Sequence, residues 1–520
     1  MKNSQKKIIL INLPPGGTKW NTPRSMVWPS TAILLIASLL KEKGYTVKII
    51  DINIHENYIN IIKKHLSNDT IFVGLSVMVS QIYWGLKISE EIKNINRRVK
   101  IVWGGPHATL YPEQTVCNDN VDIVVINEGT KAIVNLVKGL LNNTDISIIK
   151  GIAFKDVNNC IRVTKQEDCD SIEDIPFFDY SLIDTSSYLT STVPSVYERE
   201  FSNYNSKIKI MPILTGLGCP YKCQFCINVI LKRRYRFRAA LDIVDEIERL
   251  QKKYDVNTFL FFDEDFFISK MRMREFLDLV EKRNLKFNWR MWCRVDHFNE
   301  KHVTGEIISR LGRVGYGSLV MGAESGNQSI LDDLKKGITL EQIQNSLKVV
   351  KNSDKIFPRY SFMVGLEGET FEQACETYRF CLKIKKTHLK ADIAHPVLFR
   401  LYPGSPIFDS LCKKYDITMP NTLNEWSNFI KQEEGNIESL SFSDMKWMPK
   451  KLIKNYKNMD FYYRLAERFF VEKKSVNKNF LYKVLSKHFL YVLENAAIAR
   501  VKLGYYRLPI EKTIISFFRK

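Results

Sequence analysis

The chain has 520 residues, a length typical of about three domains. Its 45% hydrophobic and 12% aromatic content suffices for large cores and excludes a disordered or low-complexity chain. The formal net charge is +20, but Lys and Arg occur along the whole sequence without an RNA-binding signature, so no nucleic-acid partner is expected.

The cysteines and apolar runs indicate the cellular compartment. Of ten cysteines, only Cys219, Cys223 and Cys226 lie at the spacing of metal ligands, and the others lack the dense pattern of a disulfide-bonded scaffold. The first apolar run is too short for a signal peptide, and the longest one, residues 31–40, is shorter than a membrane span. A reducing cytoplasm is the expected location.

Residues 1–150 alternate between strand and helix patterns. Helices are expected from Ser30 to about Lys43, over residues 82–97 and from about residue 131. Between them lie apolar runs of strand length at residues 7–12, 46–51, 71–76, 99–104 and 123–126. The alternation predicts a doubly wound parallel sheet of the Rossmann or flavodoxin type.

Such a sheet binds ligands beyond the carboxyl ends of its strands. The loops expected there are rich in Gly, Pro, Ser and Thr, namely residues 13–17, 76–80, 104–109 and 127–130. No G-x-G-x-x-G sequence favours a dinucleotide. The next segment, residues 151–207, is expected to bridge two domains and to contain a β-hairpin around residues 157–159.

Three cysteines form the sequence C-x3-C-x2-C in the loop from Gly218 to Cys226. Thiolates suit iron–sulfur clusters, and three of them leave one iron of a four-iron cluster open to a substrate. Zinc is the alternative, but it usually takes four nitrogen or sulfur ligands, and no second Cys pair is present. The loop follows an expected strand at residues 209–215, where α/β barrels place their active sites.

Strand–helix units repeat through residues 208–425. Six expected strands predict a partial (β/α)6 barrel: residues 211–215, 258–262, 288–294, 317–322, 359–364 and 395–401. Each residue beyond a strand end could singly be an ordinary loop residue, but their register after successive strands favours one common site. These residues are Asp263, Glu264, Arg294, Glu324, Ser325, Gly326 and Gly365.

Two long helices are expected in the C-terminal segment, residues 426–520. They cover residues 448–471 and 479–503 and carry apolar residues on one face and Lys or Arg on the other. A small helical domain that caps the barrel, or forms a wall of its pocket, is favoured over a basic amphipathic surface for lipid.

The cysteine loop resembles the radical S-adenosylmethionine (SAM) superfamily, whose loop is C-x3-C-x-aromatic-C, with Phe225 in the aromatic position. The resemblance implies a [4Fe-4S] cluster on the three cysteines and SAM bound to the open iron. It places Asp263 and Glu264 at the SAM amine and Arg294 at its carboxylate. Further SAM contacts are implied for Phe225, Glu324, Ser325, Gly326 and Gly365, although Glu367 stands where Pro is usual in the family's G-L-P-G-E-T.

The first domain resembles the cobalamin-binding domain of B12-dependent radical SAM enzymes. Residues 104–109 and the later Asn127-Glu128-Gly129 are similar to that family's G-G-x-H-x-T and E-G-[ET] patterns. His55 lacks the Asp and Gly of a D-x-H-x-x-G motif, so cobalamin without a protein His ligand is implied. A flavodoxin-like domain that has lost its ligand is the alternative. The implied contacts are Pro14, Pro15, Gly16, Ser76, Gly104, Gly105, Pro106, His107, Glu128 and Gly129.

Together the resemblances imply a cobalamin-dependent radical SAM C-methyltransferase. The reduced cluster would cleave SAM to a 5′-deoxyadenosyl radical that takes hydrogen from an unactivated carbon, and methylcobalamin would donate the methyl group. The implied partners are a small-molecule, natural-product or lipid substrate and an electron donor such as flavodoxin or ferredoxin. Peripheral membrane contact is not favoured.

Two alternatives stay open. A B12 radical SAM enzyme that cyclises, rearranges or couples carbon atoms would share these motifs, and only the mass of its product would distinguish it. A non-catalytic cobalamin or iron–sulfur sensor or carrier would differ by forming no 5′-deoxyadenosine.

Overall fold

The computed structural model describes residues 6–14, 28–55, 57–166, 171–172, 175–189, 207–393, 395–434, 445–471, 480–507 and 509–512. The chain forms two compact units, and both are discontinuous in sequence. The first comprises Met1–Gly218, Leu231–Phe262 and Thr418–Ser441, and the second comprises Cys219–Ile230, Asp263–Ile417 and Phe442–Lys520. These two units do not coincide with the four predicted consecutive segments, because each unit combines parts of several of them. The division into four domains stays a prediction.

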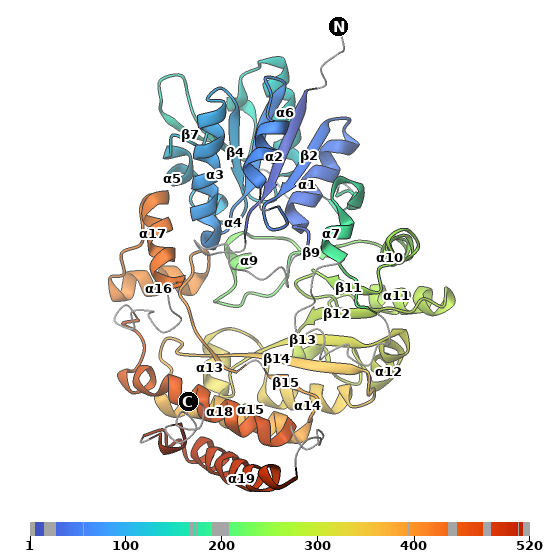
Figure 1. Cartoon of the computed structure of the whole chain (residues 1–520), viewed down its shortest axis with the longest axis vertical. Helices are drawn as coiled ribbons and strands as arrows, with labels where there is room; N and C mark the ends of the chain where they lie inside the picture. The colour runs from blue at the N-terminus through green and yellow to red at the C-terminus, as the bar shows by residue number, and fades with distance from the viewer. Residues whose placement is uncertain are drawn as a thin grey trace. The chain divides into compact units, whose positions relative to one another are not determined.

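The first unit is built on a seven-stranded sheet with strand order β2-β1-β3-β4-β5-β6-β7 (Figure 1). The first five strands are parallel, as predicted, whereas β6 and β7 form an antiparallel hairpin beside β5. The predicted hairpin therefore extends this sheet. The strands are β1 (Lys7–Asn12), β2 (Thr46–Asp51), β3 (Thr70–Ser76), β4 (Lys100–Gly104), β5 (Ile123–Val125), β6 (Ile152–Lys155) and β7 (Ile161–Val163).

Helices cover both faces of the sheet. α2 and α3 share one hydrophobic core with the strands, whereas α1 and α6 contact each other and β3. Ser30 caps α1 as predicted, since its hydroxyl accepts the Ile33 N–H. Sequence patterns missed α2, because only two of its eight residues are buried. The helices are α1 (Thr31–Glu42), α2 (Tyr58–His65), α3 (Ile82–Ile95), α4 (Pro106–Leu110), α5 (Pro112–Cys117) and α6 (Thr130–Asn142).

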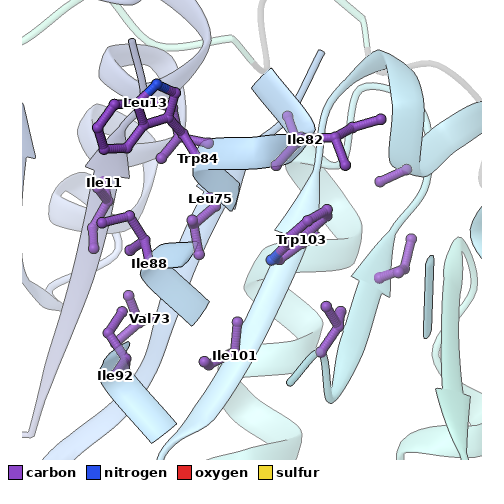
Figure 2. Close-up of a cluster of buried hydrophobic side chains, with 14 of the residues drawn as sticks. Ile11, Leu13, Val73, Leu75, Ile82, Trp84, Ile88, Ile92, Ile101 and Trp103 are labelled. Carbon is purple, nitrogen blue, oxygen red and sulfur yellow. The ribbon is translucent and has the colours of Figure 1, made fainter. Parts of the chain in front are cut away.

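Side chains of α3 and of the strands beneath it pack around Trp103 (Figure 2). Trp103 is fully buried, and its indole N–H donates to the Ser89 hydroxyl at 3.0 Å. Gly85 of α3 leaves room for the indole, because a Cβ at that position would lie 2.8 Å from the ring. The hydrophobic core of the first unit therefore requires α3 and β4 to lie close together.

The segments on either side of the cysteine loop also belong to the first unit. β8 (Ile210–Ile213) pairs in parallel with β11 (Thr258–Phe261). The Tyr180 hydroxyl donates to the Pro212 carbonyl oxygen at 2.7 Å, which fixes the preceding segment against β8. The helices of this part are α7 (Thr185–Leu189) and α10 (Ala240–Tyr254).

A helix from late in the sequence completes the first unit. α17 (Leu423–Glu434) inserts Leu423 and Trp426 into the core that contains α2 and α3. The Trp426 indole N–H donates to Gln114 at 2.8 Å, and the Gln114 amide donates to the Pro420 carbonyl oxygen at 3.0 Å. Sequence patterns gave no indication of this partnership, because the two segments lie about 300 residues apart.

The second unit carries the later strands of the predicted barrel. β12, β13 and β14 are parallel neighbours, and β14 also pairs in parallel with two short strands, β15 and β16. The predicted sixth strand is limited to the two residues of β16. The strands are β12 (Asn288–Cys293), β13 (Gly317–Glu324), β14 (Ile356–Val364), β15 (Asp392–Ile393) and β16 (Val397–Leu398).

Helices of the second unit follow its strands and continue to the C-terminal part. The two predicted long helices are confirmed as α18 and α19, with α18 packed on α15 and α19 packed on α18 (Figure 1). Of the helices described, none is long and apolar enough to cross a membrane. The helices are α9 (Ile227–Ile230), α11 (Lys270–Lys282), α12 (Gly305–Val314), α13 (Gln328–Asp333), α14 (Leu340–Val350), α15 (Phe371–Thr387), α16 (Pro406–Tyr415), α18 (Lys450–Val471) and α19 (Phe480–Leu503).

Replacing Gly85 by Ala should destabilise the first unit. Gly-to-Ala changes usually stabilise a helix, but this methyl group would overlap the Trp103 ring, and overpacking a core costs about 1–3 kcal/mol. Thermal unfolding followed by circular dichroism should show a lower Tm. Gly139→Ala in α6 is the matched control, because its Cβ would lie no closer than 3.2 Å to an Ile side chain. An unchanged or higher Tm for Gly85→Ala would contradict the packing.

Candidate active site

The cysteine loop begins at a glycine with a constrained backbone. Gly218 follows strand β9 (Gly216–Leu217) with a φ of +76°, and a Cβ there would overlap the Arg234 carbonyl group. The glycine lets the chain turn directly into Cys219. Cys223 is buried, whereas Cys219 and Cys226 are half-buried.

Backbone hydrogen bonds hold the loop in place. The Gln224 N–H donates to the Leu334 carbonyl oxygen at 2.9 Å, and the Ile407 N–H donates to the Gln224 carbonyl oxygen at 3.1 Å. The Cys226 N–H donates to the Cys223 carbonyl oxygen at 3.1 Å. The middle of the loop is therefore fixed to the ends of α13 and α16.

Burial affects the thiols of the loop. It raises the pKa of Cys219 to about 11 and also raises that of Cys226, so a bound metal must replace their protons. In the described part of the chain, no three His, Cys, Asp or Glu side chains converge as the ligands of a single metal ion would.

Arg294 is bound to the cysteine loop and its surroundings. Its guanidinium forms two bonds to Asp296, at 2.9 and 3.1 Å, and donates to the Lys336 carbonyl oxygen at 2.7 Å. It also stacks on Tyr221, 3.7 Å from the ring centroid, and lies 3.9 Å from the Cys223 sulfur. In the structure these contacts tie the guanidinium to the cysteine loop, and its predicted role at the SAM carboxylate stays a prediction.

Glu324 ends β13 in an ion pair that the sequence did not reveal. The strand is irregular between Gly322 and Glu324, and Glu324 has a φ of +64°. Its carboxylate lies 2.9 Å from the Lys336 ammonium, which is 5.6 Å from the centroid of the Phe225 ring. Burial alone would lower the pKa of Lys336, but Glu324 and Cys223 raise it, so the lysine is charged beside the thiols.

The acidic residues after β11 have different partners. Asp263 is 3% exposed and pairs with Arg272 at 3.2 Å, and Asp265 pairs with His297 at 2.8 Å. Glu264 is half-buried. Asp263 is thus engaged in a buried ion pair, whereas Glu264 keeps a more accessible carboxylate, and the predicted SAM-amine contact of both residues stays a prediction.

Ser325 and Gly326 pack against α15. The Ser325 hydroxyl lies 3.2 Å from the Thr377 hydroxyl, which also accepts the Gly326 N–H at 3.0 Å. A Cβ on Gly326 would lie 2.6 Å from Phe380. Both predicted SAM-contact residues thus have packing roles that account for their small side chains.

A buried carboxyl group organises the loop at Gly365. Glu369 accepts the N–H groups of Gly365 and Leu366, while the Gly365 carbonyl oxygen accepts the Trp447 indole N–H at 2.9 Å. Gly365 has a φ of +85°, and a Cβ there would overlap Met448. Burial raises the pKa of Glu369 to about 7. The glycine is therefore required by the loop itself.

In the first unit, the carboxyl ends of β3 and β4 form a cradle of backbone groups. The Val77 N–H donates to the Gly104 carbonyl oxygen at 2.8 Å, and the His107 N–H donates to the Val77 carbonyl oxygen at 3.1 Å. Gly105 has a φ of +91°, and a Cβ there would lie 2.7 Å from Val77 N and 2.9 Å from the Ser76 hydroxyl. Predicted contact residues of both loops thus lie together.

His107 lies buried next to this cradle. It is 1% exposed, and neither ring nitrogen has a hydrogen-bond partner among the residues described. Burial lowers its pKa to about 4, so the imidazole is neutral near pH 7. Its ring packs against Tyr111 and Trp426, with centroids 5.4 and 5.6 Å away. Because buried polar groups normally have partners, an unpartnered imidazole fits a site for a further polar group.

The remaining residues predicted to contact cobalamin differ from one another in their surroundings. Glu128 forms an ion pair with Arg236, with one bond of 3.0 Å, so its carboxylate is engaged within the protein. Gly129 begins α6 with a φ of +70°. Pro14 is buried and Pro106 is the first residue of α4, whereas Pro15 and Gly16 lie outside the described residues.

Two family models match the chain. The B12 binding domain model matches residues 21–137, and the radical SAM superfamily model matches residues 213–381. These ranges contain the cradle at Gly105 and the cysteine loop, respectively. The two candidate sites therefore fall in different matched regions.

Relatives cover most of the chain at low identity. An uncharacterised methyltransferase of Pyrococcus horikoshii is 26% identical over 404 residues, which are 77% of this chain and 82% of the relative. The anaerobic magnesium-protoporphyrin IX monomethyl ester cyclase of Rubrivivax gelatinosus is 26% identical over 75% of this chain and 67% of that enzyme.

Solved structures share the fold. The cobalamin-dependent SAM radical enzyme OxsB, with aqua-cobalamin and SAM bound, has a TM-score of 0.67 and 17% identity, covering 99% of this chain and 75% of its own. The radical SAM methyltransferase TsrM of Kitasatospora setae, with cobalamin and a [4Fe-4S] cluster bound, has a TM-score of 0.59 and 19% identity, covering 80% and 76%.

Replacing Arg294 by Lys should loosen the cysteine loop. Lysine keeps the charge but loses the paired bonds to Asp296 and the stack on Tyr221, and loss of such supporting contacts typically lowers metal affinity about 10-fold or more. After anaerobic reconstitution, we expect faster loss of iron to a chelator and weaker cluster absorbance. Arg313→Lys, at an exposed ion pair of α12, is the matched control. Equal iron retention by the two variants would argue against this role.

Proposed function

The chain belongs to the radical SAM enzymes that carry a B12-binding domain, and we propose that it methylates an unactivated carbon of a small-molecule, natural-product or lipid substrate. The observation that carries the proposal is the presence in one chain of a three-thiol loop and of a B12-type sheet edge with an unpartnered His107. Similarity to a methyltransferase over 77% of the chain supports it. As a radical SAM enzyme, the chain is not the non-catalytic sensor or carrier considered above.

The proposed cofactors are a [4Fe-4S] cluster, SAM and cobalamin, with Cys219, Cys223 and Cys226 as the cluster ligands. When bound, the cluster and SAM supply a radical that removes hydrogen from carbon, and cobalamin supplies the methyl group. The protein would hold these groups, exclude water and accept an electron from a donor such as flavodoxin or ferredoxin.

For SAM we propose contacts from Glu264, Glu324 and the Phe225 ring. Glu264 is preferred over Asp263 because Asp263 is already paired with Arg272. Lys336 keeps the Glu324 carboxylate fixed beside Phe225. The backbone around Ser325, Gly326 and Gly365 would line the same site.

For cobalamin we propose contacts from Ser76, Gly104 and Gly105, where backbone can approach a large ligand closely. The neutral imidazole of His107 would form a hydrogen bond to a polar group of the cofactor. No protein His ligand to cobalt is proposed, because His55 lacks the motif of such ligands.

A second candidate function is ring formation on the substrate without net methylation. The similarity to the Rubrivivax gelatinosus cyclase, at the same 26% identity as the methyltransferase, favours it. The two candidates share every residue discussed above, so product mass separates them.

The test begins with anaerobic purification of the full chain in the presence of hydroxocobalamin. About four irons and one corrinoid per chain are expected. The Cys219→Ala/Cys223→Ala/Cys226→Ala variant should lose the iron and keep the corrinoid, because the cradle lies in the first unit. Incubation with reductant and SAM deuterated at its methyl group should give a product with the labelled methyl group. Four irons without corrinoid would refute methyl transfer through cobalamin.

Replacing Trp426 by Ala should weaken corrinoid binding. The change removes the ring that covers His107 and the bond to Gln114, so water can reach the imidazole. An absorbance titration with hydroxocobalamin should show a Kd at least about 10-fold higher, a loss of about 1.4 kcal/mol. Trp426→Phe keeps an aromatic ring, so its Kd should lie between that of the unaltered protein and that of Trp426→Ala. An unchanged Kd for Trp426→Ala would remove α17 from the cobalamin site.

A further inference from the structure

The positive charge of the chain is concentrated at its C-terminal end. Residues 445–520 contain 18 Lys and Arg against 5 Asp and Glu, a net charge of +13 out of +20 for the whole chain. Lys and Arg do occur along the whole sequence, but the acidic residues that balance them elsewhere are scarce in this segment. A local excess of this size creates a positive potential that attracts anionic surfaces.

In the described part of this segment, most cationic side chains are exposed, whereas the acidic ones are buried or paired. Between residues 445 and 512, no acidic side chain of the described part is exposed: Asp460 pairs with Arg464, Glu467 with Lys385 and Glu511 with Arg500, and Glu494 is buried. In contrast, nine cationic residues of the same part are exposed. They are Lys446, Lys450, Lys451, Lys454, Lys457, Arg464, Lys502, Arg507 and Lys512.

Large apolar side chains of the same segment are also exposed. Val492 is 61% exposed and Leu503 is 78% exposed. With the exposed Ala499 between them, they lie at helical spacing on one face of α19. Tyr491 and Ile510 are 56% and 59% exposed. A basic surface that also exposes aliphatic and aromatic side chains is typical of helices that lie in a membrane interface.

We propose that α18, the part of α19 from Tyr491 onward, and residues 504–507 and 509–512 form a docking surface for an anionic phospholipid bilayer. Lipid phosphates would bind the exposed lysines, and Val492 and Leu503 would enter the headgroup–acyl boundary. A second copy of the chain is a poor occupant, because two surfaces of this charge repel each other. RNA would explain the cations but leave Val492, Leu503 and Ile510 without partners. The proposal does not depend on the proposed chemistry.

Sedimentation of the full chain with lipid vesicles tests the proposal. We expect binding to vesicles of phosphatidylcholine mixed with phosphatidylglycerol and at least about 10-fold weaker binding to phosphatidylcholine alone. Raising the salt concentration from about 0.1 M to 1 M should weaken the initial attraction, since the Debye length falls from about 10 Å to 3 Å. Equal binding to both vesicles, or no binding, would overturn the proposal.

Two variants separate charge from insertion. Lys450→Glu/Lys454→Glu/Lys457→Glu changes three exposed lysines of α18, and Val492→Asp/Leu503→Asp changes the apolar face of α19. Each should lower vesicle binding about 10-fold or more. Lys63→Glu/Lys64→Glu/Arg98→Glu, which makes the same net change in the first unit, is the matched control and should bind normally.

Unaltered folding of each variant is checked by its Tm and by iron content after reconstitution. Equal loss of binding in the control would overturn the proposal, because it would reduce the interaction to net charge. Salt-sensitive binding of a single-stranded RNA oligonucleotide without vesicle binding would also overturn it and identify a nucleic-acid surface.

Discussion

One guanidinium fixes the geometry of the cysteine loop. The loop has little regular secondary structure before α9, so its thiols are positioned by contacts with other elements. Arg294, from the end of β12, stacks on Tyr221, approaches the Cys223 sulfur and bonds to the Lys336 carbonyl oxygen. A planar side chain with five donors can serve three partners in different directions, which an ammonium group cannot do as rigidly. The loop therefore takes its position from the sheet.

The first unit has its candidate site at the edge of a sheet, where a large ligand must be able to approach the backbone. Glycines at the carboxyl ends of β4 and β5 remove side chains where the backbone comes close. The core behind this edge is completed by α17, whose Trp426 covers His107 and Tyr111. Trp426, which comes late in the chain, thus sets the polarity around the imidazole of His107. Folding of the edge depends on a segment made after the radical SAM strands.

Sequence patterns predicted the parallel strands of the first unit well, because buried parallel strands are continuous apolar runs such as Lys7–Asn12. The three cysteines of the predicted cluster loop lie within eight residues of one another, so the sequence alone is enough to single them out. Contacts between residues far apart in the sequence could not be predicted from such patterns. Lys336 belongs to no recognisable sequence motif. Its role follows only from its contacts with Glu324 and Phe225 in the structure. Position after a strand marked Asp263 and Arg294 as candidate site residues, which stays a prediction, but it could not show that they pair with Arg272 and Asp296.

The buried ion pairs of the second unit argue for function over stability. Asp263–Arg272 and Glu324–Lys336 both lie in this unit with side chains at most 10% exposed, and His297 forms a buried hydrogen bond with Asp265. Removing a charge from water costs several kcal/mol, and apolar replacements of such pairs are often neutral or stabilising. A core selected for stability alone would have little use for two such ion pairs. Fixed, paired charges are instead what a site needs when it must orient a charged ligand without reorganising as the reaction proceeds.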